Sequence, residues 1–266
     1  MLRDITLGQY YMTDSVIHAL DPRTKLFGTM IFIISLFIAD SPIGYGLSAV
    51  ALVLTVLLCR VPVRFILRGM KAIAVLLLLT VVFNIFLTPG EVIWSAWKFH
   101  ITKEGVFIAL QMMLRLSFLI IGSSIMTLTT TPNNLTDGLE TSLGFLKKVR
   151  VPVHEISMMM SIALRFIPIL MEETDKIMKA QMARGADFES GNLVKRAKAL
   201  IPLLVPLFVS AFRRAGDLAM AMESRCYRGG EGRTKMKPLK YASRDVVAYI
   251  VIFLFFTASI TVKVIF

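Results

Sequence analysis

The sequence predicts an all-α membrane protein with about five transmembrane helices and a cytosolic domain of amphipathic helices. Hydrophobic residues make up 56% of the 266 residues and charged residues only 18%, whereas an ordinary soluble domain carries about 25% charged residues. Five apolar runs are separated by polar or proline-containing breaks, and a long amphipathic segment precedes the fifth run. We therefore expect a transmembrane domain at residues 1–130, a cytosolic domain at residues 131–241 and a C-terminal transmembrane helix at residues 242–266.

The first two apolar runs, residues 26–39 and 43–59, are short compared with the roughly 20 residues that a spanning helix needs. They are either two short spans or a re-entrant hairpin with its tip at residues 40–42. In both cases the two flanks face the same side of the membrane. These flanks carry Arg23 and Lys25 before the pair and Arg60, Arg64, Arg68 and Lys71 after it. Because basic residues are retained on the inner side, this side is expected to be the cytoplasm.

The third and fourth runs, residues 70–87 and 106–128, enclose a loop with few basic residues. Trp94 and Trp97 in this loop are suited to an interface belt, so the loop is expected outside. With a fifth run at residues 246–262, the prediction is a multi-pass membrane protein. Its N-terminus is expected in the cytoplasm and its C-terminus outside.

Arg115 is the charge that lies deepest in an apolar run, about ten residues into the fourth. A charged residue inside a span is a functional candidate by default. Since no run contains an acidic residue, we favour a structural role in which Arg115 binds backbone carbonyls or a partner subunit.

The segment at residues 131–245 holds nineteen of the thirty lysines and arginines and is expected in the cytosol. Its apolar residues recur every three or four positions at residues 155–182 and again at residues 193–227, which predicts two long amphipathic helices. Pro168 is expected to kink the first helix without ending it. A shorter helix is expected at about residues 134–145. The apolar centre of the last helix is too short to span and is expected to lie against the membrane or other helices.

Both long helices end at an arginine-centred tripeptide, Ala183-Arg184-Gly185 and Ser224-Arg225-Cys226. Glycine ends helices readily by taking the left-handed conformation, so Gly185 is the expected stop of the first helix. Cys226 moves the expected stop of the second helix to Gly229. An exposed arginine presents a planar set of donors that can dock into another protein, but a cation at a helix C-terminus is also stabilised by the helix dipole alone. Both interpretations stay open at this point.

Several function classes lack their motifs. The net charge of +12 could suggest nucleic-acid binding, but no nucleic-acid motif is present. The sequence contains neither a Gly-Lys pair for a phosphate-binding loop nor a Gly-x-Ser-x-Gly elbow. His154-Glu155 lacks the second histidine of a zinc site. We therefore expect no catalytic residues, no metal and no cofactor bound by this chain.

Four stretches together resemble the transmembrane T component (EcfT/CbiQ-like family) of energy-coupling factor (ECF) transporters, which import vitamins and metals in prokaryotes. The stretches are residues 20–26 (LDPRTKL), 130–139, 163–168 (ALRFIP) and 183–187 (ARGAD). The resemblance covers nearly the whole chain, and the stretch from residue 163 to residue 187 is its most specific part.

The resemblance implies a non-catalytic subunit in a prokaryotic cell membrane that couples ATP hydrolysis to import. Arg184 and Arg225 would dock into grooves of two ABC-type ATPase subunits, which bind the ATP and Mg. The membrane helices would hold an S component that binds a vitamin or metal ion. The contrasting hypothesis is a membrane-embedded enzyme acting on lipid, with both arginines binding head-group phosphates, which predicts activity from the purified chain alone.

Overall fold

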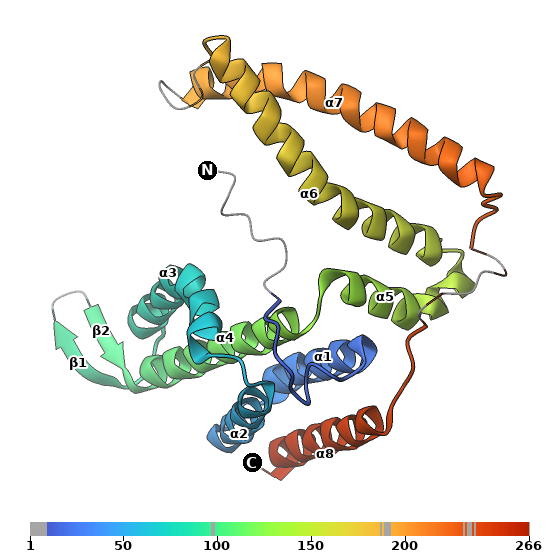
Figure 1. Ribbon diagram of the computed structural model, residues 1–266. Helices are drawn as coiled ribbons and strands as arrows, with labels where there is room; N and C mark the ends of the chain where they lie inside the picture. Colours follow the sequence, from blue (N-terminus) through green and yellow to red (C-terminus); the bar gives the residue numbers. More distant parts are fainter. Residues whose placement is uncertain are drawn as a thin grey trace. The chain divides into compact units, whose positions relative to one another are not determined.

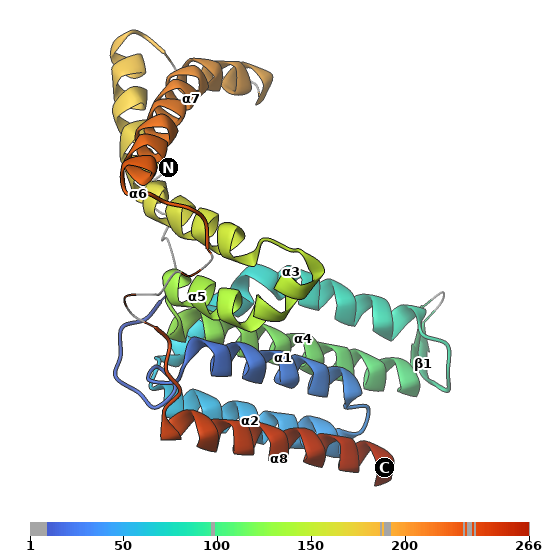
Figure 2. The ribbon, with the colours of Figure 1, turned by 90° about the vertical axis from the view of Figure 1, so that its right-hand side faces the viewer.

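The computed structural model describes residues 10–96, 99–186, 188, 193–230, 232, 236 and 238–265, and most of them are helical. The chain divides into two compact units (Figures 1 and 2). One unit contains Leu143–Pro238, and the other contains Gly8–Ser142 together with Leu239–Phe266. We refer to the second as the membrane unit.

Each of the five predicted apolar runs forms a helix of the membrane unit. These helices are α1 (Pro22–Ile38), α2 (Pro42–Cys59), α3 (Val63–Leu87), α4 (Lys103–Thr129) and α8 (Ser243–Ile265), and a shorter helix, α5 (Pro132–Ser142), packs on α1. Among the described residues, α2, α4 and α8 are long and apolar enough to cross a membrane, as is α6 (Val153–Ala183), and α3 qualifies as a bent pair. The predicted class, an all-α multi-pass membrane protein, is confirmed.

Helices α1 and α4 run antiparallel in a register that two hydrogen bonds define. The Lys25 ammonium donates to the Thr129 carbonyl at 2.8 Å, and the Arg115 guanidinium donates to the Ala39 carbonyl at 3.1 Å. The α1–α2 turn therefore lies beside Arg115, roughly 18 Å along α4 from its start at 1.5 Å per residue. This register explains why the first two runs are short.

The two flanks of the α1–α2 pair lie on the same side of the membrane unit, as predicted. Ile17, which precedes α1, packs against a buried cluster that contains Cys59 and Val61 from the end of α2 and Leu128 from the end of α4. Apolar burial and two hydrogen bonds, from the Tyr11 amide to the Leu128 carbonyl and from the Lys25 ammonium to the Thr129 carbonyl, hold the ends of these helices together.

Helix α8 runs along α1 in the same direction (Figure 2). At one end the Asp21 amide donates to the Asp245 carboxylate at 2.8 Å, and at the other the Lys263 ammonium lies 3.2 Å from the Asp40 carboxylate. Helix α4 therefore ends at Thr129, and α8 begins near Asp245, on the side where α1 begins. This is the predicted alternation of sides.

The loop between α3 and α4 contains an antiparallel hairpin, β1 (Val92–Ala96) and β2 (Phe99–Thr102), which the sequence analysis did not predict. β-Branched and aromatic residues fill both short stretches and favour strands. Thr102 then caps α4 by accepting a hydrogen bond from the Gly105 amide at 3.1 Å. The prediction for Trp94 and Trp97 concerns side chains outside the described part of the chain.

The other unit is built on α6 and α7 (Leu193–Ser224), preceded by a 3₁₀ helix, η2 (Leu143–Val149). Helix α6 continues through Pro168, as predicted, and α7 continues through Pro202 and Pro206. The short helix expected at residues 134–145 begins earlier, as α5, and passes into the 3₁₀ helix η2 at Leu143. Its boundaries were therefore wrong.

Candidate functional site

The end of α6 is a Schellman motif centred on the first arginine tripeptide. The Gly185 amide donates to the Met182 carbonyl at 3.0 Å, and the Ala186 amide donates to the Gln181 carbonyl at 2.9 Å. Gly185 takes the left-handed conformation with φ of 88°, which a residue without a Cβ adopts at little cost. Arg184 is the C-cap residue, between the last helical residue and the glycine.

The end of α7 repeats this geometry with a different residue in the left-handed position. The Cys226 amide donates to the Glu223 carbonyl at 2.8 Å, and the Tyr227 amide donates to the Met222 carbonyl at 3.0 Å. Cys226 itself has φ of 55°. The prediction that the helix stop moves to Gly229 was wrong, because the cysteine adopts the conformation that was expected to require glycine. Arg225 therefore follows the last residue of α7 as Arg184 follows that of α6.

All six residues of the two tripeptides, Ala183, Arg184, Gly185, Ser224, Arg225 and Cys226, are exposed. The α6 and α7 ends that carry them lie far apart within the unit, as the gold end of α6 and the orange end of α7 show (Figure 1). Two guanidinium groups presented in the same local geometry at separate points can engage two separate acceptor sites.

A polar contact joins α6 to α7 away from the tips. The Arg214 guanidinium donates to the Glu173 carboxylate at 2.8 Å, and the Ser210 hydroxyl donates to the other oxygen of this carboxylate. The side chains of Arg214 and Glu173 are 37% and 22% exposed. This contact constrains how the two helices cross, and hence where their ends lie.

Apolar side chains on α6 and α7 remain largely exposed in the isolated chain. On α7 these are Leu200, Ile201, Leu204, Val205, Phe208, Val209 and Phe212, and on α6 they include Ile156, Met159 and Met160. Contiguous apolar surface of this kind marks a contact with a membrane or another protein. The sequence analysis expected such a contact for the centre of α7.

Arg115 lies beside the α1–α2 turn, where its guanidinium contacts both the Ala39 carbonyl and, at 3.5 Å, the Asp40 carboxylate. Its side chain is 17% exposed. The geometry fits the favoured structural role with backbone carbonyls. The sequence does not identify Asp40 as an acidic partner of Arg115, because Asp40 lies between two apolar runs. Only the short α1–α2 pair brings it to the depth of Arg115.

Residues 20–26 form an anchor between helix ends. Asp21 caps α1, and its carboxylate accepts two hydrogen bonds of 3.0 Å from the Arg23 guanidinium, which also lies 4.0 Å from the centre of the Tyr241 ring. Asp245, only 2% exposed, accepts from the Asp21 and Ala242 amides. Asp245 was not among the predicted residues, although it stands at the start of the fifth run, where a carboxylate can accept hydrogen bonds from the free amides of the first helical turn.

The described residues contain no group of three or more His, Cys, Asp or Glu side chains that could hold a metal ion. The polar clusters of the membrane unit instead join one helix to another. What the geometry offers to other molecules is exposed arginine at helix ends and exposed apolar surface.

These features define a class: a multi-pass membrane protein with a pair of amphipathic helices that present arginine at their ends. The family described as CbiQ, cobalt transport protein, matches residues 13–236. A protein of Clostridium kluyveri is 56% identical over 250 residues, which is 93% of each chain, and one of Thermosediminibacter oceani is 55% identical over 249 residues, which is 94% of each. One of Ruminiclostridium cellulolyticum is 50% identical over the full length of both chains.

All three relatives are named energy-coupling factor transporter transmembrane protein EcfT. The chain therefore belongs to the family of energy-coupling factor transporter transmembrane proteins. This membership suggests a non-catalytic transporter subunit, and the hypothesis of a lipid-modifying enzyme is not favoured.

Proposed function

We propose that this chain is the energy-coupling membrane subunit of an ECF-type importer. Two ABC-type ATPase subunits would dock at the ends of α6 and α7, and a membrane S component that binds a vitamin or metal ion would complete the importer. The observation that carries this proposal is the repeated helix end, with an exposed arginine at the C-cap of both α6 and α7. ATP and Mg would be bound by the ATPases, and no cofactor by this chain.

The orientation follows from the basic residues. Arg23, Arg60 and Arg64 belong to the side on which α1 begins and α2 ends, and this side would face the cytoplasm of the prokaryotic cell. The chain enters and leaves the unit of α6 and α7 from this side, so both tips would be accessible to cytosolic ATPases.

We assign α1, not α6, to the set of membrane-crossing helices. Helix α1 packs along α4 and α8, both long and apolar enough to span, and it is tied to them at both of its ends. Helix α6 carries a charged face in its second half, where Glu172 and Lys176 are exposed. It fits a lever that moves with the ATPases and transmits their closing and opening.

The membrane helices would hold the S component, and the exposed apolar surface of α6 and α7 would also contact it. A partner that is itself a membrane protein can cover this apolar surface, because neither protein then has to be soluble in water. ATP-driven movement of the two tips would then change the angle of the apolar surface and reorient the S component in the bilayer.

The decisive experiment is co-purification of the ATPases with charge-reversed tips. Arg184→Glu combined with Arg225→Glu should release both ATPases and leave the chain inserted in the membrane. If each arginine is desolvated beside an acidic partner, removing one costs about 3–5 kcal/mol of binding. The matched control reverses two exposed arginines that lie inside the same helices, Arg165→Glu and Arg213→Glu. Retention of the ATPases by the tip variant would refute the docking assignment.

Cys226 provides a second readout that needs no substitution. The chain has two cysteines, of which Cys59 is buried and Cys226 is exposed beside Arg225. A maleimide should label Cys226 in the isolated chain and be excluded when the ATPases are bound. Equal labelling in the assembled transporter would contradict docking at this tip.

A further inference from the structure

The membrane unit contains a large groove between α1, α2, α4 and α8 whose wall is apolar except at one end. Its volume is about 800 Å³, within the range of sites that bind small molecules. Val50, Leu54 and Val251 line it and are more than half exposed, so the groove is open to the surroundings of the helices. In a bilayer those surroundings are lipid.

The polar end of the groove is cationic. Lys25 and Arg244 both line it. The Lys25 ammonium donates to the carbonyls of His18 at 3.1 Å and Thr129 at 2.8 Å. Within the described residues these bonds use two of the three N–H groups of a lysine, and the third can serve a ligand.

The neighbouring carboxylates do not balance the two cations. Asp21 pairs with Arg23, and Asp245, which accepts from two main-chain amides, supplies one negative charge near Lys25 and Arg244. One positive charge is left over, which an anionic ligand would balance. Basic pockets between transmembrane helices on the cytoplasmic side are a recurrent feature of binding sites for anionic lipid head groups.

The length of the groove fits a lipid of one leaflet. Along α8 its lining extends from Arg244 to Ala258, roughly 21 Å at 1.5 Å per residue. Half of a hydrocarbon core is about 15 Å thick. A phosphate at the cationic end thus leaves room for an acyl chain that runs along α8 toward the middle of the bilayer.

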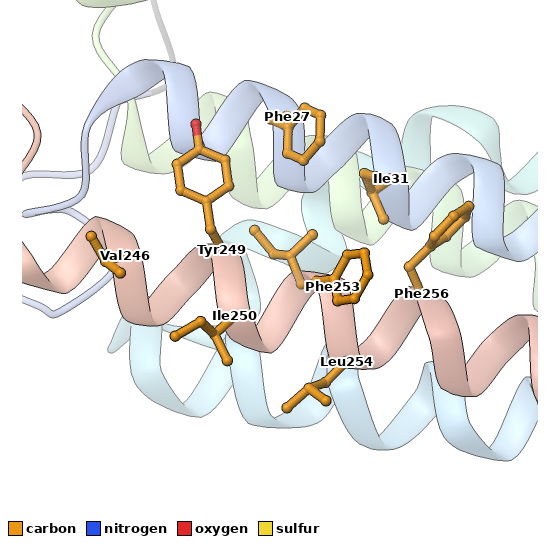
Figure 3. Close-up of a pocket in the computed structure, with 9 residues that line it drawn as sticks. Phe27, Ile31, Val246, Tyr249, Ile250, Phe253, Leu254 and Phe256 are labelled. Atoms are coloured by element: carbon orange, nitrogen blue, oxygen red, sulfur yellow. The ribbon is translucent and has the colours of Figure 1, made fainter.

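A second groove of the same unit lacks this charge. It lies on another side of the α1–α8 seam and has a volume of about 460 Å³. Phe27, Ile31, Tyr249, Ile250 and Phe253 line it (Figure 3), and its walls are almost entirely apolar. It can accept acyl chains but offers no cation to select a head group, which makes it an internal control.

We propose that the groove between α1, α2, α4 and α8 is a binding site for an anionic phospholipid, with the phosphate at Lys25 and Arg244 and one acyl chain along α8. The occupied site would fill the space between four helices at the side where the anchor of residues 20–26 lies. A transmembrane helix of another protein could also cover the apolar wall, but it would leave one of the two positive charges unbalanced, because Asp245 supplies a single negative charge nearby.

The test is native mass spectrometry of the full-length chain after exchange into phosphatidylglycerol and phosphatidylcholine with identical acyl chains, in equal amounts. Wild type should retain phosphatidylglycerol preferentially. Arg244→Gln, at an exposed position that does not endanger folding, should lower this preference about fivefold, the effect of one basic residue at an anionic surface. The matched control, Arg64→Gln, removes an exposed cation outside the groove and should leave the preference unchanged.

A second pair of variants tests the acyl path. Ala51→Phe narrows the charged groove and should remove the retained phosphatidylglycerol, whereas Ile31→Phe narrows the uncharged groove and should not. Equal retention of the two lipids by wild type, or an unchanged preference in Arg244→Gln, would overturn the proposal. Loss of a co-purifying membrane protein from Ala51→Phe, with the lipid preference intact, would overturn it in favour of a partner helix.

Discussion

Substituting the residue that takes the left-handed conformation at each helix end tests whether the stability of the tips depends on backbone conformation. The first variant is Cys226→Gly, which places glycine where the native residue has φ of 55°, and the reciprocal variant is Gly185→Ala, where φ is 88°. A Cβ at Gly185 would meet no atom within 4 Å, and Cys226 is exposed, so the main effect of either substitution is on the backbone.

The magnitude follows from two opposing terms. A residue with a Cβ pays about 1–2 kcal/mol for the left-handed conformation, whereas glycine pays about 0.5–1 kcal/mol for its greater freedom in the unfolded chain. Cys226→Gly should therefore stabilise the end of α7 by about 0.5–1 kcal/mol, and Gly185→Ala should destabilise the end of α6 by a similar amount. These free energies correspond to about a twofold to fivefold change in the local opening equilibrium.

Amide hydrogen exchange measures this opening at the bonds in question. The Cys226 and Tyr227 amides, which donate to the carbonyls of Glu223 and Met222, should exchange about twofold to fivefold more slowly in Cys226→Gly. The Gly185 and Ala186 amides are the corresponding probes at the other end and should exchange faster in Gly185→Ala. Unchanged exchange at both ends would show that the left-handed residue does not limit opening, and the reasoning would be wrong.

Three further predictions concern the polar contacts. Asp245→Asn should lower the free energy of unfolding of the solubilised chain by about 1–3 kcal/mol, because the side-chain NH₂ of asparagine would face one of the two main-chain N–H groups from which the carboxylate accepts. An unchanged unfolding temperature would contradict this. A double-mutant cycle of Glu173→Gln and Arg214→Gln should give a small favourable coupling that weakens with salt, because the pair is partly exposed. Zero coupling at low salt would contradict a role of this pair in holding α6 against α7. Burial lowers the pKa of His18 below its usual 6.5, so the folded chain binds fewer protons than the unfolded chain. The contribution of His18 to stability should be complete well above pH 6.5 and should be lost as the pH falls through 6.5 toward the lower pKa of the folded chain. His18→Gln should abolish this loss in thermal unfolding scans.

The membrane helices were predictable because each needs only a long apolar run, and all five runs became helices. The apolar runs do not indicate how far each helix is shifted along its neighbours. The carbonyl of Ala39 meets Arg115 because α1 and α4 are antiparallel and start from the contact between Lys25 and Thr129. Such pairings join residues that are far apart in the chain, and nothing in the local pattern of either helix indicates them.

The hairpin between α3 and α4 was missed for a different reason. The residues between the third and fourth apolar runs were interpreted as a loop, and their charge and aromatic content indicated only the side of the membrane on which it lies. Strands of four or five residues have too few positions for alternation to be distinguished from chance. The β-branched and aromatic content of these strands was the available signal, but it depends strongly on context.

The second helix end shows what a residue motif can and cannot specify. The glycine of the first tripeptide was taken as the stop signal, so a cysteine in its place predicted a later stop. In the structure α7 still ends at the tripeptide, and Cys226 itself takes the left-handed conformation. The two residues after each arginine make the same pair of hydrogen bonds. The shared feature of the two tips is therefore a backbone geometry that sets an arginine at the C-cap, and glycine is only its least strained residue. If docking requires this geometry, any residue that can reach the left-handed region is tolerated after the arginine. A β-branched residue is not expected to be tolerated there, so Cys226→Val should disrupt the tip although valine differs little from cysteine in size.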